Sequence, residues 1–196
     1  MSAFLAPIHF WMYDKILIAQ ELTFKLEEKF LNKEEREEVE SLFPGLYSKD
    51  LEEVIDQSNI HGWLHIAVSN VEIRFAYIVK TLLDKGISLE EIKKVAFEYG
   101  KTFPEQEVSS LKDAYELLMD ILLDGLPCDV SISVAREEEN ELEFVLYNDI
   151  HKQYFNEFDL EVSLYHEIRE AFVNGIFERY ALKYKNISDS NKLITR

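Results

Sequence analysis

The segment from Leu51 to about Leu83 constrains the fold most, because apolar residues occupy nearly all of its faces. A helix that is hydrophobic on most sides is normally central and packed by several neighbours. Only six glycines and four prolines interrupt the 196 residues, and this composition favours long helices over many short strands. The sequence therefore predicts a mainly helical domain around one long central helix over residues 51–83.

Four further helices are predicted from caps and breakers. Pro7 suits the first turn of a helix, and Ser88 followed by Glu91 has the form of a capping box. A short extra helix is an open alternative for the charged run after Leu31. The four predicted helices run from Ile8 to about Leu31, from Ser88 to Phe103, from Ser109 or Ser110 to Gly125, and from about Leu160 to Tyr184.

Residues 130–147 predict one antiparallel β-hairpin, because apolar and polar residues alternate on both sides of a turn around Glu137 to Asn140. Two strands alone are marginally stable, so its apolar face should rest on a helix or its edge should pair with a second chain. The predicted fold class is α+β, predominantly α-helical. We expect one globular domain over residues 1–185, with helices in 1–85 and helices plus the hairpin in 86–185. Residues 186–196 are expected to form a flexible tail.

Charge and cysteine content exclude several classes of partner. Acidic residues outnumber basic ones by 38 to 21, for a formal charge of −17. Such a surface repels phosphate backbones and anionic lipids, so we expect neither a nucleic-acid nor a membrane partner. The single cysteine, Cys128, cannot form an internal disulfide, which favours a cytoplasmic location. Residues 1–13 lack the basic leader of a signal peptide, and no stretch reaches the ~20 apolar residues of a membrane span.

The central helix carries ionisable residues on its apolar stripe. At ~100° per residue, His65 and Glu72 lie within about 60° of His61, and Ser58 lies on the same line. This places the three ionisable side chains in the predicted core, where unpaired burial costs several kcal/mol. They should therefore hydrogen-bond, bind a ligand or line a cavity. The opposite face, expected to meet solvent, carries Asn70, Arg74, Tyr77 and Thr81.

Two histidines at i and i+4 can both reach one metal ion from one face of a helix. His61 and His65 have this spacing, and a third ligand could be Glu72, His9 or His166. Iron and zinc are the candidate metals, and a haem with one axial histidine is a further alternative. Neither a Glu-x-x-His nor a His-Glu-x-x-His motif is present. The same side chains can equally be hydrogen-bonded core groups without any ligand.

Several pieces of the C-terminal half occur in a recognisable order. They are the helix end Phe97-Glu98-Tyr99-Gly100-Lys101, the helix from Asp113 to Asp124, Gly125, the strands over 130–147 and the helical segment Phe172-Val173-Asn174-Gly175-Ile176. This order resembles the 4-vinyl-reductase-type domain, a small ligand-binding fold of transcription-factor sensors and transport-particle subunits, with which haem-based nitric oxide sensors are grouped. The chain departs from it in lacking a second glycine in each helix and cysteines near the last helix. The resemblance implies a pocket enclosed by helices and a hairpin, and it assigns no catalytic residue.

These patterns predict non-enzymatic binding or sensing of a small hydrophobic ligand, a metal or a haem at an interior site. The expected lining residues are Ser58, His61, His65 and Glu72. A homodimer is expected through exposed aromatic or hairpin surface. One alternative is an iron- or zinc-dependent enzyme with His and Glu ligands. The other is a structural or adaptor dimer, in which the stripe is only a buried polar network.

Overall fold

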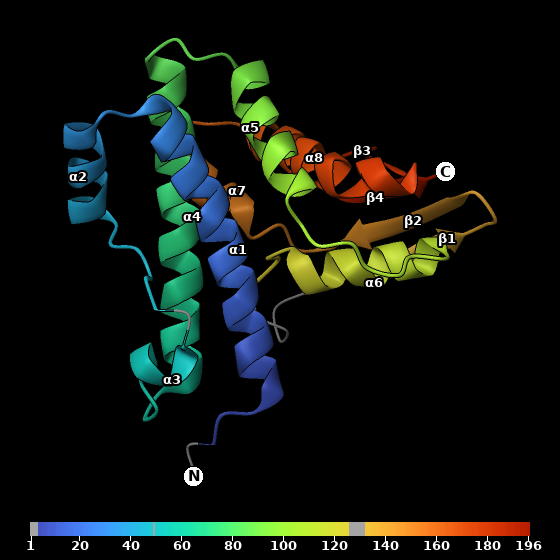
Figure 1. Cartoon of the computed structure of the whole chain (residues 1–196), viewed down its shortest axis with the longest axis horizontal. Coiled ribbons are helices and arrows are strands. Elements are labelled where there is room, and N and C mark those ends of the chain that lie inside the picture. Colours follow the sequence, from blue (N-terminus) through green and yellow to red (C-terminus); the bar gives the residue numbers. More distant parts are fainter. Residues whose placement is uncertain (1–3, 49, 126–131) are drawn as a thin grey trace.

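The computed structural model describes residues 4–48, 50–125 and 132–196. Within them the chain forms eight α-helices, one short 3₁₀ helix and a four-stranded antiparallel sheet (Figure 1). The predicted α+β, predominantly helical fold is confirmed. About five helices were predicted and the structure adds further short ones, and the predicted hairpin is one half of the sheet. Cys128 and the predicted start of the hairpin at residues 130 and 131 lie outside the described residues.

The elements follow one another along the chain in the order helices, hairpin, helices, hairpin. The helices are α1 Pro7–Phe30, α2 Lys33–Leu42, α3 Leu51–Val54, α4 Ile60–Asp84, α5 Leu89–Lys101, α6 Leu111–Ile121, α7 His151–Asn156, α8 Ser163–Phe177 and the 3₁₀ helix η1 Glu178–Tyr180. The strands are β1 Ile132–Glu137, β2 Glu141–Leu146, β3 Lys183–Asn186 and β4 Asn191–Thr195.

The two long helices α1 and α4 lie side by side and form an arm that extends away from the other helices and the sheet (Figure 1). The prediction of one unbroken helix over residues 51–83 was wrong, since α3 and α4 are separate helices. Asp56 accepts hydrogen bonds from the backbone and the hydroxyl of Ser58, and the Asn59 side chain caps the N–H of Gly62. These local bonds replace helical ones and restart the helix at Ile60.

The face of α4 that was predicted to meet solvent is partly covered. Arg74 is only 4% exposed, because α1 and α2 supply its partners. Its guanidinium binds both carboxylate oxygens of Glu27 at 2.8 Å each and one oxygen of Glu40 at 2.9 Å. It also donates to the carbonyl of Phe43 at 2.6 Å. The expectation of a solvent-exposed Arg74 was wrong because α4 is packed on more than one side.

The four strands pair in the order β1-β2-β4-β3. Residues 186–196 were predicted to be a flexible tail, but residues 191–195 form β4, which pairs with both β2 and β3. Buried and partly buried residues alternate along this strand, and Lys192 and Ile194 occupy its buried face. The prediction failed because a charged residue at a buried position hides the two-residue period.

Helix α8 is shorter than predicted and crosses α5 closely. It ends at Phe177 rather than Tyr184, and Ala181, with a φ of 53°, turns the chain into β3. Gly100 of α5 and Gly175 of α8 meet at the crossing. A Cβ on Gly100 would lie 2.1 Å from the carbonyl oxygen of Phe172, and one on Gly175 would lie 2.1 Å from that of Phe97. Only glycine permits this approach of the two backbones.

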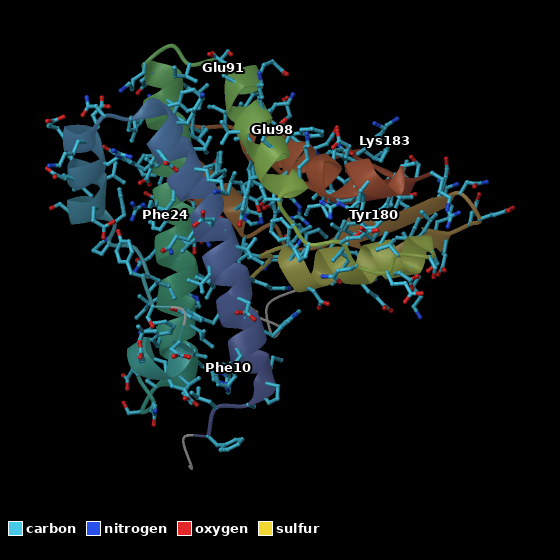
Figure 2. All side chains as sticks on the ribbon, viewed as in Figure 1. Phe10, Phe24, Glu91, Glu98, Tyr180 and Lys183 are labelled. Atoms are coloured by element: carbon cyan, nitrogen blue, oxygen red, sulfur yellow. The ribbon has the colours of Figure 1, made fainter. Side chains whose placement is uncertain are left out.

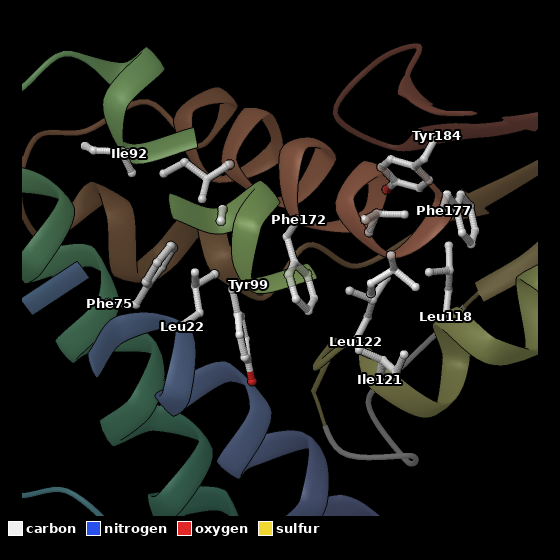
Figure 3. Close-up of a cluster of buried hydrophobic side chains, with 14 of the residues drawn as sticks. Leu22, Phe75, Ile92, Tyr99, Leu118, Ile121, Leu122, Phe172, Phe177 and Tyr184 are labelled. Atoms are coloured by element: carbon white, nitrogen blue, oxygen red, sulfur yellow. The ribbon is translucent and has the colours of Figure 1, made fainter. Parts of the chain in front are cut away.

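The main core lies where α1, α4, α5, α6, α8 and the sheet meet, and Figure 3 shows Leu22, Phe75 and Phe172 within it. A second cluster of buried residues fills the arm between α1, α3 and α4. Figure 2 shows Phe10 near the free end of the arm, where Phe4 and Ile8 are also exposed. A homodimer through such a surface remains a prediction. None of the described helices combines the length and the apolar composition required to span a membrane.

Replacement of Gly100 or Gly175 by alanine should destabilise the protein by about 3 kcal/mol, because the new Cβ overlaps a backbone carbonyl that cannot move freely. In an unhindered helix the same change would stabilise by about 1 kcal/mol. Urea unfolding of both variants, with the exposed Lys94→Ala of α5 as control, measures the difference. A stabilising effect of either glycine variant would contradict the close crossing.

Candidate functional site

Four ionisable side chains form a chain of alternating charge in the interior. Glu72 of α4 accepts a hydrogen bond from Nδ1 of His151 at 2.8 Å, and the Nε2 of His151 lies 3.5 Å from Oδ1 of Asp124. Asp124 in turn pairs with both terminal nitrogens of Arg169. All four residues are at most 4% exposed. We call this set the buried quartet.

Charge pairing within the quartet keeps His151, Asp124 and Arg169 in their charged forms. Burial alone would lower the pKa of His151, but the charge of Glu72 and the hydrogen bond to Asp124 outweigh it and raise the pKa to about 9. Burial would raise the pKa of Asp124, but Arg169 and His151 hold it well below its usual range. Two negative and two positive side chains therefore balance in a region of low dielectric constant.

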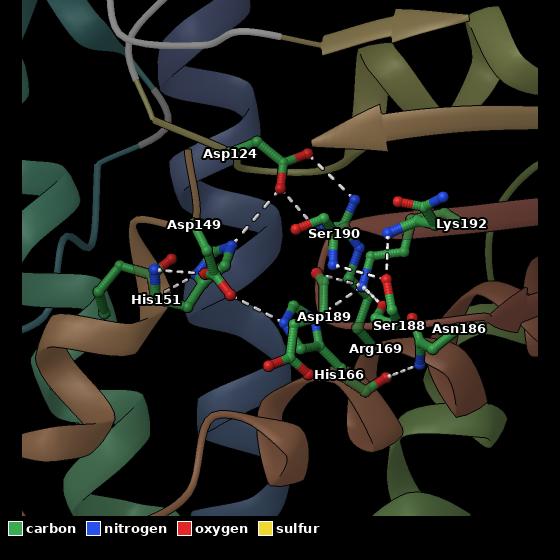
Figure 4. A network of polar contacts seen from close by, with 12 residues as sticks. Asp124, Asp149, His151, His166, Arg169, Asn186, Ser188, Asp189, Ser190 and Lys192 are labelled. Atoms are coloured by element: carbon green, nitrogen blue, oxygen red, sulfur yellow. Dashed lines mark hydrogen bonds and ion pairs between the residues drawn. The ribbon is translucent and has the colours of Figure 1, made fainter. Parts of the chain in front are cut away.

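A second chain of polar contacts joins the quartet to the C-terminal hairpin (Figure 4). Asp149 accepts the backbone N–H of His151 at 3.0 Å and the Nε2–H of His166 at 2.8 Å. The Nδ1 of His166 then accepts from the ammonium of Lys192 at 3.2 Å. Lys192 also donates to the carbonyls of Ser188 and Asp189. The buried lysine thus ties β4 and its turn to α8.

Local sequence explains how three of the quartet residues reach the interior. Helix α6 ends at Ile121, earlier than the predicted Gly125. The next three residues are buried but not helical, and this places Asp124 in the core. Arg169 lies on the buried face of α8 beside Ile168 and Phe172. His151 begins α7 and stacks on the ring of Tyr165, with centroids 3.7 Å apart.

A cavity of about 50 Å³ lies beside the quartet, between α1, α4, α8 and the end of α6. Its wall is mostly apolar. The polar residues in the wall are Glu72, Tyr165 and Arg169. Burial and the charge of Glu72 raise the pKa of Tyr165, so its hydroxyl is protonated. Leu22, Phe75, Ile121, Leu122 and Phe172, which belong to the apolar wall, are seen in Figure 3.

The three polar residues in the wall differ in their hydrogen-bond partners. The Nε of Arg169 has no partner among the described residues. Glu72 bonds to His151 through Oε2, and Tyr165 stacks its ring on His151. Buried polar groups are normally satisfied by protein, water or ligand. The Nε of Arg169 is fully buried and faces the hydroxyl of Tyr184, so a molecule in the cavity could bond only to Glu72 or Tyr165.

The structure separates the residues that were predicted to form one site. Glu72 is buried as expected, but Ser58, His61 and His65 are exposed. The buried positions of α4 centre on the line through Leu64 and Val71, about 60° from His61. The prediction of buried histidines was wrong because α1 and α3 cover the other side of this end of α4, which leaves the flank with His61 and His65 open.

Of the predicted metal ligands, the structure brings only His9 beside His61, with ring centroids 5.5 Å apart. His9 accepts the backbone N–H of Ala6 through Nδ1, so its neutral ring carries the proton on Nε2. Burial and the neighbouring His61 lower its pKa. Glu72 and His166 bind other partners in the interior. Within residues 4–48, 50–125 and 132–196, no group of three or more His, Cys, Asp or Glu side chains is placed to hold a metal ion.

No protein-family model, curated protein or solved structure matches this chain. The function of the site is therefore inferred from its geometry. Sequence reasoning missed Asp124, His151 and Arg169. One usable signal was Arg169, a charged residue flanked by the apolar positions 168, 172 and 173 of a helix.

The stability of the protein should fall as the pH rises from 6.5 to 8. His151 has an unfolded pKa near 6.5 and a folded pKa of about 9, so its stabilising contribution is complete below the unfolded value and is lost as the pH rises through the folded value. Over this window the loss from His151 alone is about 2 kcal/mol. Four groups with lowered pKa values contribute with the opposite sign and reduce the net fall: the buried Lys15 and Lys192, whose pKa values burial lowers to about 8, and the histidines His9 and His166.

Chemical denaturation at several pH values between 6.5 and 8 measures this slope. The His151→Gln variant should be less stable at pH 6.5 and should lack the part of the slope that His151 contributes. An equal slope in the variant would show that another group causes it.

Removal of one charge from the quartet should be costly. Asp124→Asn leaves Arg169 and His151 buried without their shared anion, and breaking a buried ion pair in this way costs about 3–5 kcal/mol. Glu116→Gln, at an exposed position of α6, is the control and should change stability by less than about 0.5 kcal/mol. Equal unfolding midpoints of the two variants would mean that the quartet does not stabilise the fold.

Proposed function

We propose that this protein binds a small, largely apolar molecule in the cavity beside the buried quartet, without chemically changing it. The observation that supports the proposal is the wall of the cavity, in which Glu72, Tyr165 and Arg169 are the polar residues of an otherwise apolar lining. A pocket with an apolar lining and a few convergent polar groups is typical of a ligand site.

The size of the cavity limits the ligand. A water in the liquid occupies ~30 Å³, so 50 Å³ corresponds to about two waters. An engineered protein cavity that binds benzene measures ~150 Å³, three times as much. A haem does not fit this volume, and the ligand is accordingly a small molecule of a few non-hydrogen atoms.

The interior histidines favour binding over catalysis. His151 uses Nδ1 for Glu72 and Nε2 for Asp124, and His166 uses its two nitrogens for Asp149 and Lys192. A general acid or base needs hydrogen-bond reach to the substrate, and these rings have no free nitrogen to offer. The two histidines therefore act in positioning the charged groups around the cavity.

Xenon is a suitable first probe, because it enters small apolar cavities without hydrogen bonds. Saturable shifts of methyl resonances from Leu22, Val71 and Ile168 are expected in NMR spectra under xenon pressure. Ala19→Leu places a larger side chain in the wall and should abolish these shifts. The same substitution at the exposed Ala135 should leave them unchanged.

The absence of xenon binding in the folded wild-type protein would contradict the proposal and favour a purely structural role for the quartet. Metal analysis and a visible spectrum of the purified protein test the remaining alternatives. Stoichiometric iron or zinc, or a Soret band, would replace the cavity proposal by a metal or haem site.

A further inference from the structure

The sheet has two outer strands, and side chains close the edge of one of them. On β3, the backbone N–H of Tyr184 donates to Oδ1 of Asn174 at 2.9 Å, and its carbonyl accepts from Nδ2 of the same side chain at 2.9 Å. The N–H of Asn186 donates to Glu170 at 2.8 Å. Side chains of α8 thus occupy this edge and keep a further strand from pairing with it.

The outer edge of β1 is open. The N–H of Leu146 in β2 donates to the carbonyl of Ser190, on the side of β4. Ile132 lies opposite Leu146, and Val134 lies opposite Phe144. Since the two sides of a strand alternate in their hydrogen bonds, Ile132 and Val134 direct their N–H and C=O groups away from β2. Within the part of the chain that the structure describes, these groups have no partner. We call this side of the strand the β1 edge.

Val134 gives the β1 edge an apolar contact. Its side chain is on the same face of the sheet as that of Phe144, which is fully buried, but Val134 is 42% exposed. Helix α6 packs on β2 and β4 and leaves the side chain of Val134 open. A strand added at this edge would place a residue directly beside Val134. An apolar residue there would extend the buried face of the sheet.

Acidic residues surround the end of the β1 edge at the hairpin turn. Residues 136–143 contain five glutamates and one arginine. This arginine, Arg136, pairs with glutamates of the hairpin itself, whereas Glu137 and Glu139 are exposed. Arg196, which follows β4, directs its guanidinium to a backbone carbonyl of the loop before α6. The turn therefore has an excess of negative charge, which favours a positively charged partner.

We propose that the β1 edge binds an extended peptide with basic residues at its N-terminal end and apolar residues at alternate positions after them. A strand that joins a sheet edge gains backbone hydrogen bonds, and its alternate side chains meet one face. Antiparallel pairing places the N-terminal end of the peptide at the turn after β1, beside Glu137 and Glu139. The apolar residues then lie beside Val134 and Ile132. This site is separate from the cavity and does not depend on the proposed function.

A second copy of this chain fits the β1 edge less well. It would bring another formal charge of −17 and the same acidic turn, and like charges repel. The bulge between Val134 and Arg136 limits the regular part of the edge to the start of β1, and such bulges hinder edge-to-edge pairing of sheets. A short basic peptide avoids both obstacles, because it neutralises the turn and needs only a few backbone bonds.

The first test uses the wild-type protein and the peptide Lys-Arg-Lys-Thr-Val-Thr-Val-Thr. Hydrogen exchange of the Val134 amide should be fast in the free protein and about tenfold slower with saturating peptide, since the amide then has a partner. The Tyr184 amide, which already donates to Asn174, should exchange slowly in both. A Val134 amide that is protected in the free monomer, or that gains no protection from the peptide, would overturn the proposal.

N-methylated peptides test strand pairing without any change in the protein. Methylation of the two valines removes the N–H groups that face the β1 edge, and binding should weaken about tenfold, as two lost hydrogen bonds imply. Methylation of the threonines removes N–H groups that face solvent, and the affinity should change less than about threefold. An equal loss in both peptides would contradict strand pairing.

Charge reversal at the turn tests the basic end of the peptide. The double variant Glu137→Lys with Glu139→Lys should bind about tenfold more weakly at low salt, and the difference should shrink at high salt. Glu34→Lys with Glu38→Lys changes the net charge equally at exposed positions of α2, which is far from the hairpin (Figure 1). This control should bind nearly as the wild type does. An equal loss in both variants would mean attraction to the whole acidic surface and not to the β1 edge.

Sedimentation of the wild-type protein without peptide tests the competing occupant. The protein should show no dimer in which the Val134 amide is protected. A dimer that forms with rising concentration and slows exchange of this amide would assign the β1 edge to a second copy and overturn the proposal.

Discussion

The ion pair between Asp124 and Arg169, extended by His151 and Glu72, is the interaction on which most of the structure depends. Its members come from α4, the segment after α6, α7 and α8, so one connected set of contacts holds four parts of the chain in register. Hydrophobic packing would tolerate small shifts among these helices, but charge-assisted hydrogen bonds depend on direction as well as distance. The buried quartet therefore fixes how the arm of α1 and α4 meets the α8–sheet body, and the cavity exists at this junction.

A protein with a formal charge of −17 gains from keeping its interior charges balanced. Its acidic surface repels itself, which opposes the compact state, so an additional unpaired carboxylate inside would be doubly unfavourable. Arg74 pairs with acidic side chains in the same way at a second place, where it binds Glu27 and Glu40 between α1, α2 and α4. In both places an arginine joins helices that are far apart in sequence. Arginine suits this role because its planar guanidinium binds carboxylates with two parallel hydrogen bonds.

Local patterns in the sequence predicted the elements whose signals are local. The start of α1 at Pro7, the Ser88 cap of α5 and the hairpin turn after Glu137 were all recognised, because caps and turns depend on neighbouring residues. The partners of buried charges could not be predicted, since helical periodicity shows which face is apolar and not what covers it. His61 was placed in the core and Arg74 on the surface for that reason, and the structure reverses both. Of the predicted site, Glu72 alone lies at the cavity, and its partner His151 comes from a short helix that was not predicted.

The position of β4 in the middle of the sheet has a consequence for how the chain folds. The β1–β2 hairpin can form from neighbouring residues, but β2 pairs on its other edge with β4, as in the contact of Leu142 with Ile194. Until β4 is synthesised and inserted, that edge of β2 has free backbone donors and acceptors. Unpaired strand edges are templates for association with other chains. Nascent chains that have passed β2 but not β4 are thus the forms most prone to aggregate, and a chaperone that shields this edge on the ribosome would raise the yield of folded protein.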